Sequence, residues 1–145
     1  MKNTWASILV LFCVSLLENC GSHSPSPAPP TAVEKATALM VASPWTMKSL
    51  TIDGTADDTF FVGLAITFTT SGFTAKNGDP VWPASGTWSF TDTNATSIKR
   101  SDDLTIQLDE LTASNMQLSL VWTSTTTSGG RMNSVAGKHV FVFSH

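Results

Sequence analysis

The sequence predicts an all-β fold: an up-and-down antiparallel β-barrel of about eight short strands, preceded by a signal peptide and a proline-rich linker. Three observations support this. From residue 44 to 145, short runs alternate apolar and polar residues with a period of two, and turn residues separate them. No stretch after residue 43 keeps a 3.6-residue period for three turns. Threonine, which suits exposed strand faces, is abundant there. An antiparallel sandwich shares these features, so the pattern leaves the closure of the sheet open.

The chain opens with an apolar run, WASILVLFCVSLL, over residues 5–17. Its length suits the core of a signal peptide and falls short of the ~20 residues of a membrane-spanning helix. Cys20 follows three positions after Leu17, which resembles the lipobox of bacterial lipoproteins. In that family the chain is cut before the cysteine and the cysteine is acylated. Glu18 and Asn19 depart from the small residues usual there. We expect residues 1–19 to be a lipoprotein signal peptide and Cys20 to be the lipid attachment site.

The use of cysteine agrees with this interpretation. The sequence has two cysteines, and Cys13 would leave with the signal peptide. Cys20 would then stand alone, so no intramolecular disulfide could form. Several acyl chains on one residue would anchor the chain firmly, since each buried methylene contributes ~0.8 kcal/mol. The expected location is a bacterial membrane, namely the outer membrane, facing the periplasm or the cell surface. A plain secreted protein with one free thiol is the alternative.

Residues 20–43 form the expected connection between lipid and domain. GSHSPSPAPP, residues 21–30, is rich in proline, which removes backbone donors and favours an extended course. TAVEKATALMVA, residues 31–42, changes to helix-forming residues, and Ala36, Leu39 and Met40 would share one face. We expect a short helix or turn here that packs against the domain.

Residues 44–145 form the expected barrel domain. Turn pairs such as Ser71-Gly72 and Asn77-Gly78 separate the strand-like runs. The parity of apolar residues changes within the first run, which predicts a bulge or bend near Ser49. The run over residues 60–69 alternates throughout, so Phe60, Val62, Leu64, Ile66 and Phe68 are expected to point inwards. The predicted strands lie at residues 45–52, 60–69, 73–76, 86–91, 104–108, 116–122 and 138–144.

Four motifs occur in order along this domain: SPWTMKSLTIDG, ITFTTSGFT, SGTWSFT and LTIQLDELTASNMQLSL. Together they resemble the lipocalin-like domain of lipoproteins from Bacteroidetes-type bacteria, over residues 39–145. Ser43 stands where classical lipocalins have the glycine of a G-x-W start. The resemblance implies an eight-stranded, calyx-like barrel with no agreed ligand and no catalytic residues. The family positions are taken by Trp45, Phe68, Gly72, Gly86, Trp88, Phe90, Leu111, Met116 and Leu118.

The sequence offers little for catalysis or metal binding. The three histidines lack the spacing of a metal site, and no G-x-S-x-G elbow singles out a nucleophilic serine. Acidic residues 53–58 fit a connection between strands better than a calcium loop. Asp102 and Asp103, beside Lys99 and Arg100, are typical of solvated turn charges. We expect no enzyme activity, no metal and no cofactor. The net charge of −3 also argues against nucleic acid as a partner.

Aromatic residues give the remaining functional hypothesis. Trp45 and Trp88 are expected in the core, because both lie in strands. Trp82 lies on a loop between two prolines, where it could stack on a ligand or plug one barrel end. Trp122 ends a strand and could line the barrel mouth. We expect a monomer that binds a small apolar or aromatic ligand, with Trp82, Trp122, Phe90 and Phe141 as candidate binding residues. The alternative is a tethered protein- or glycan-interaction module with a filled barrel as its scaffold.

Overall fold

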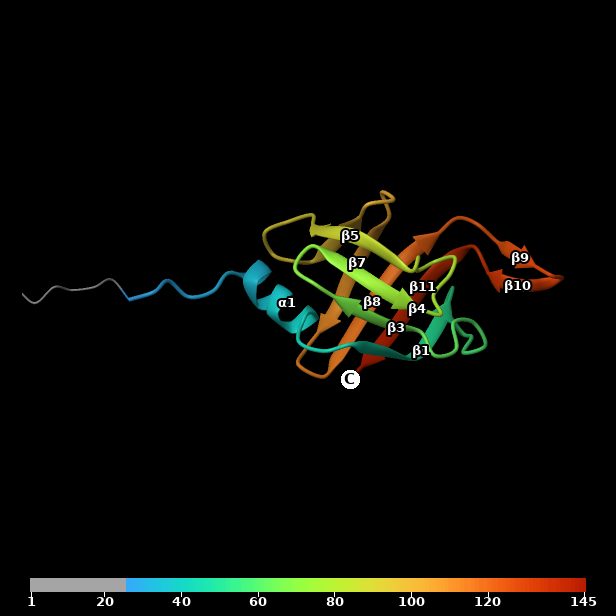
Figure 1. Ribbon diagram of the computed structural model, residues 1–145, viewed down its shortest axis with the longest axis horizontal. Coiled ribbons are helices and arrows are strands. Elements are labelled where there is room, and N and C mark those ends of the chain that lie inside the picture. The colour runs from blue at the N-terminus through green and yellow to red at the C-terminus, as the bar shows by residue number, and fades with distance from the viewer. Residues whose placement is uncertain (1–25) are drawn as a thin grey trace, which may run out of the picture.

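The computed structural model describes residues 26–145, so Cys20 and the predicted signal peptide lie outside the described residues. Within this range, one short helix precedes a closed, eight-stranded antiparallel barrel, as the sequence predicts (Figure 1). A small hairpin projects from one end of the barrel. The barrel strands are β1 (Trp45–Ile52), β3 (Ala65–Phe68), β4 (Gly72–Lys76), β5 (Ser85–Phe90), β6 (Ser97–Arg100), β7 (Thr105–Leu111), β8 (Asn115–Trp122) and β11 (Gly137–Ser144). The other elements are α1 (Ala32–Met40), β2 (Thr55–Ala56), β9 (Thr126–Ser128) and β10 (Arg131–Ser134).

The barrel is a simple meander. Each barrel strand pairs with the next one in the chain, and β11 returns to pair with β1 from Thr46–Ser144 to Ile52–His139. The first two residues of β1 also pair with β3, so this strand bends to close the barrel. A register shift between Met47 and Ser49 confirms the predicted bulge. The bulge restores the parity of the strand, because Leu50 is buried on the inside together with Trp45.

Helix α1 covers one end of the barrel (Figure 1). A capping box starts it: the hydroxyl of Thr31 accepts from the amide of Glu34, and the Glu34 carboxylate accepts from the amide of Thr31. Ala36 and Met40 are buried, and the indole nitrogen of Trp45 donates to the Met40 carbonyl over 2.9 Å. The expected short helix within residues 31–42 is therefore confirmed.

The prediction for residues 60–69 is wrong in its first half. Strand β3 begins only at Ala65, and the preceding residues form turns. Phe61 and Gly63 adopt positive φ angles of 56° and 75°, which no β-strand permits. The side-chain amide of Asn77 donates to the carbonyls of Val62 and Gly63 and holds the turn. Val62 is therefore 71% exposed instead of pointing inwards.

Strands β2, β6, β9 and β10 lie outside the predicted runs. Strand β6 contains two basic residues of the sequence SIKR, yet it pairs with both β5 and β7 as the eighth barrel strand. Residues 124–137 lie between the last two predicted runs, where no strand was predicted. They instead contain the hairpin β9–β10, which turns through Gly129 and Gly130 with φ angles of 56° and 77°. These two angles suit a type I′ turn.

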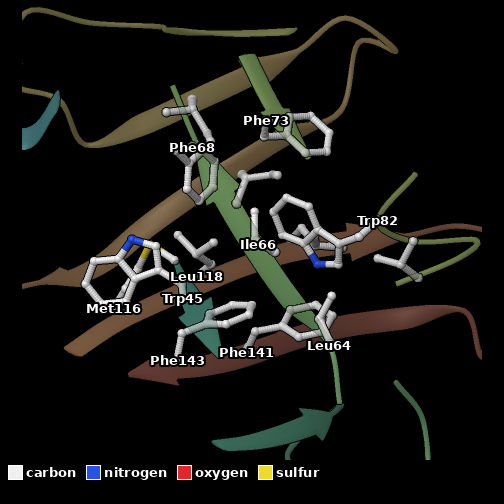
Figure 2. Close-up of a cluster of buried hydrophobic side chains, with 14 of the residues drawn as sticks. Trp45, Leu64, Ile66, Phe68, Phe73, Trp82, Met116, Leu118, Phe141 and Phe143 are labelled. Atoms are coloured by element: carbon white, nitrogen blue, oxygen red, sulfur yellow. The ribbon is translucent and has the colours of Figure 1, made fainter. Parts of the chain in front are cut away.

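Side chains fill the barrel. Figure 2 shows that aromatic and aliphatic residues from opposite walls meet along the axis. Trp45 is fully buried and Trp88 is 5% exposed, so both expected core tryptophans are confirmed as core residues. An eight-stranded barrel has an interior that is just wide enough for side chains or for one small ligand. The fully buried large side chains are Trp45, Trp82, Phe141, Phe143, Met40, Leu50, Leu64, Ile66, Ile98, Ile106, Met116 and Leu118.

Candidate functional site

Trp82 plugs the barrel from within. It lies on the connection between β4 and β5, and its amide donates to the carbonyl of Gly78 over 2.7 Å. Its ring is fully buried and meets Phe73 and Phe141 edge-on, with ring centres 5.8 and 6.1 Å apart. Figure 2 shows the indole of Trp82 between the side chains of Phe73 and Phe141. Of the two roles considered for Trp82, the geometry matches the plug and leaves no ring face for a ligand at the surface.

Arg100 supports the plug and corrects the expectation of a solvated turn charge. Its side chain is almost wholly buried, and its guanidinium carbon lies 5.2 Å from the Trp82 ring centre and 5.7 Å from that of Phe73. Its Nη1 donates to the carbonyl of Val81 over 2.7 Å, and its Nε donates to Asp102 over 3.0 Å. This hydrogen bond, together with the positive charge, lowers the pKa of Asp102. This role could not be inferred from the sequence, because Lys99 and Arg100 followed by two aspartates are typical of an exposed turn.

The four predicted ligand residues do not gather at one site. Phe141 is fully buried beside Trp82, between the rings of His139 and Phe143. Trp122 is half-buried at the end of β8, where its indole nitrogen donates to the hydroxyl of Ser134 in the hairpin. Phe90 lies at the end of β5 and packs edge-on against Trp88, with ring centres 5.1 Å apart. Phe90 borders a shallow groove of about 580 Å³ that Val33 and Thr37 of α1 also line.

The exposed apolar side chains indicate a candidate site away from the four predicted ligand residues. Among residues 26–145, the large hydrophobic residues that remain exposed are Val62, Val121 and Met132. Val62 and Met132 line the same groove, of about 400 Å³, although 70 positions separate them in the chain. We call it the loop-end groove, since it lies between the turn after β2 and the hairpin. Its lining residues are Thr59, Phe60, Phe61, Val62, Asn77, Asp79, Met132 and Asn133.

Local hydrogen bonds hold both walls of this groove. On one wall, Asp57 accepts from the amide and hydroxyl of Thr59. The base of the hairpin is fixed from the other side, where Asp53 accepts from the amide of Lys138 over 2.8 Å and donates its own amide to the Lys138 carbonyl.

The loop-end groove has one ionisable group in its lining, the carboxylate of Asp79. The ion pairs within residues 26–145 are Lys99–Asp103 and Arg100–Asp102, so Asp79 is not part of one. The groove thus combines exposed apolar side chains with a single exposed negative charge. Sequence reasoning missed it because Val62 was assigned to a strand and Met132 lies between the last two predicted runs. The positive φ angles near Val62 could not be inferred from the alternating pattern.

His139 lies close to the base of the hairpin but is fully buried. Its Nδ1 is 3.2 Å from the carbonyl of Gly137, and its Nε2 has no hydrogen-bond partner within the described residues. Burial lowers the pKa of His139. A neutral imidazole with Nδ1 protonated would satisfy the Gly137 carbonyl. The side chain is therefore part of the buried core, where it stacks on Phe141.

The described part of the chain contains no group of three histidine, cysteine or acidic residues that could hold a metal ion. None of its helices is long and apolar enough to cross a bilayer. No family model, curated protein or solved structure matches this chain. The geometry of the barrel and of its two ends therefore carries the functional argument.

Proposed function

We propose that this chain is a non-catalytic, membrane-anchored bacterial lipoprotein of the lipocalin-like type, and that its barrel is a scaffold for binding another protein at the loop-end groove. One observation carries the proposal: the large exposed apolar residues Val62 and Met132 converge on one groove, while side chains fill the barrel interior. Polar residues of the same groove surround these side chains, and exposed apolar groups that gather within a polar rim typically mark an interaction site. A filled barrel favours this role over that of a calyx.

The position of the groove suits a tethered protein. Figure 1 shows the chain entering through α1 at one end, with the hairpin at the opposite end. The proline-rich residues 21–30 would hold the barrel off a membrane, since an extended proline-rich chain spans about 3 Å per residue. An anchor at Cys20 would thus leave the loop-end groove pointing away from the lipid. This orientation is what a partner on another surface or in solution requires.

The anchor has its own test. Replacing Cys20 with alanine should move the chain from the membrane fraction to the soluble fraction of the producing cell. The matched control is Cys13→Ala, which alters the other cysteine inside the expected signal peptide and should leave the fractionation unchanged. Membrane association that survives Cys20→Ala would contradict the lipid anchor.

The interaction role is tested by a photo-crosslinking amino acid placed at Val62 in producing cells. We expect a discrete protein adduct from this position. The control position is Thr93, which is exposed and lines the groove beside α1 at the other end of the barrel. The same adducts from both positions, or none from Val62, would count against a binding site at the loop end.

A small apolar or aromatic ligand is the second candidate. The observation that favours it is the groove beside α1, where Trp88 and Phe90 form part of an apolar lining. Titration with fatty acids, aromatic compounds and oligosaccharides, followed by tryptophan fluorescence, tests this role. Saturable quenching that Phe90→Ala abolishes would favour a small-ligand binder over the interaction module.

A further inference from the structure

The hairpin β9–β10 carries free strand edges beside the closed barrel. The two strands pair with each other and with no other strand of residues 26–145. The barrel itself closes through β11 and β1, so its long strands have partners on both sides. Unpaired strand edges present rows of N–H and C=O groups that can pair with another chain. The projecting hairpin is therefore the place where an extended segment could join this protein.

The geometry of the turn identifies which backbone N–H and C=O groups have no partner within the hairpin. Gly129 and Gly130 make a two-residue turn, so the flanking residues Ser128 and Arg131 form the hydrogen-bonded pair of the hairpin. The next pair, Thr127 and Met132, is then a pair whose N–H and C=O groups point away from each other. No backbone bond from a loop reaches Met132 within the described residues. Its N–H and C=O thus lie on the outer edge of β10.

The outer edge of β10 adjoins the loop-end groove. The hairpin residues that line the groove are Met132 and Asn133, both from β10. Phe60 and Val62 line the opposite wall, and Asp79 supplies the one ionisable group. A strand added to β10 would place alternate side chains towards this wall, because side chains in a strand alternate between two sides.

We propose that the protein partner binds by adding an extended segment to the outer edge of β10, with apolar side chains towards Phe60 and Val62 and a lysine or arginine towards Asp79. This inference rests on the proposed function at the loop end and specifies the form of the partner. Charge complementarity selects a cationic segment, since Asp79 is the only ionisable group in the groove. Strand β10 spans four residues, about 13 Å at about 3.3 Å per residue, and a register shift between Met132 and Ser134 leaves Arg131 and Met132 as the regular part of its edge.

Peptide selection tests the proposal without knowledge of the natural partner. A random heptapeptide display library is selected against the immobilised full-length chain, and the enriched peptides are synthesised and titrated. We expect sequences that alternate β-branched or aromatic residues with polar ones and that carry a lysine or arginine at a fixed place. Enrichment of peptides without alternation or positive charge, or no enrichment, would overturn the proposal.

Two proline variants provide a matched comparison. Met132→Pro removes the outward N–H from the edge beside the groove, whereas Thr127→Pro removes the outward N–H of the paired residue from the opposite edge. We expect Met132→Pro to weaken peptide binding at least about tenfold and Thr127→Pro to leave it unchanged. Asp79→Asn should weaken binding several-fold and reduce its dependence on salt. Equal binding by the two proline variants would refute strand addition.

A direct measurement guards against misfolded variants. In the unmodified chain, the amide of Met132 should exchange with solvent more slowly once a selected peptide is bound, because the added strand takes up this N–H. Unchanged exchange at Met132 under saturating peptide would contradict the proposal. The crosslinking and proline experiments together distinguish a failure of strand addition from the absence of a binding site. Partner capture at Val62 that survives Met132→Pro refutes only strand addition, whereas the absence of capture at Val62 refutes the binding site itself.

Discussion

Replacing Arg100 with methionine tests the role assigned to the buried guanidinium. Methionine keeps much of the volume of the side chain but removes its charge and its donors. The variant loses the hydrogen bond to the Val81 carbonyl, the ion pair with Asp102 and the contacts with the Trp82 and Phe73 rings. These contacts hold the connection that carries Trp82. We therefore expect a less stable barrel with a looser plug.

The expected loss of stability is the difference between the interactions that the guanidinium makes and the cost of burying its charge. Hydrogen bonds that involve a charged group contribute about 1.5–3 kcal/mol each, and cation–π contacts about 0.5–2 kcal/mol. The cost of burying the guanidinium, several kcal/mol, offsets much of this gain and disappears in the variant. Because Asp102 is half-exposed, water can solvate its carboxylate after the change. We expect a net loss of about 2 kcal/mol in the free energy of unfolding.

Urea denaturation followed by tryptophan fluorescence measures this loss. With a denaturant slope of about 1–3 kcal/mol per molar, the midpoint should fall by roughly 1 M. The pH dependence gives a second readout. The pKa of Asp102 is lowered in the folded state, so its contribution is present above the unfolded pKa of about 3.9 and is lost as the pH falls through the folded value. Arg100→Met should remove this part of the acid sensitivity. A variant within about 0.5 kcal/mol of the original chain would refute the reasoning.

Three further changes probe other parts of the fold. Gly78→Ala should destabilise the protein by about 1–3 kcal/mol, measured by urea denaturation, because a Cβ there would meet the Trp82 side chain and lie 2.8 Å from its carbonyl oxygen. Gly129→Ala, whose Cβ would meet no atom, should cost about 1 kcal/mol, through its positive φ alone. Burial lowers the pKa of His139 below its ordinary value of about 6.5, so the unfolded chain binds more protons. Stability should therefore fall as the pH drops below about 6.5, and thermal melting of His139→Leu between pH 8 and 5 should lack this fall; an unchanged slope would contradict the assignment.

Most of the barrel could be predicted because its strands have one face in the core and one in water. In β8, for example, Met116, Leu118 and Leu120 are buried and recur every second residue. Sequence reasoning failed where another interaction overrides this period. Strand β6 was missed because Arg100 points inwards and compensates its charge with Asp102 and Val81. Such compensation depends on residues that only the folded chain brings together.

Before β3 the sequence pattern predicts a strand where the structure has a turn. Residues 60–64 alternate as a strand would, but the turn bonds from Asn77 to Val62 and Gly63 hold the backbone in another conformation. Periodicity describes which residues could face a core and carries no information on φ. The loop-end groove could not be predicted for the same reason. Val62 and Met132 meet there through two turns whose positions depend on the closed barrel.

The glycines of the barrel bear on the choice between a calyx and a scaffold. A Cβ at Gly86 would lie 2.7 Å from the Phe73 ring, and one at Gly78 would meet Trp82. Because these glycines have no Cβ, the aromatic rings of Phe73 and Trp82 can occupy the interior beside them. A barrel built to hold a ligand would need space at its centre, whereas here Gly86 in β5 and Gly78 in the β4–β5 connection leave room for aromatic rings that fill it. Packing of this kind makes the barrel rigid, and a rigid barrel leaves its ends as the surfaces on which binding can be built. The exposed Val62 and Met132 at the end away from α1 fit that division of roles.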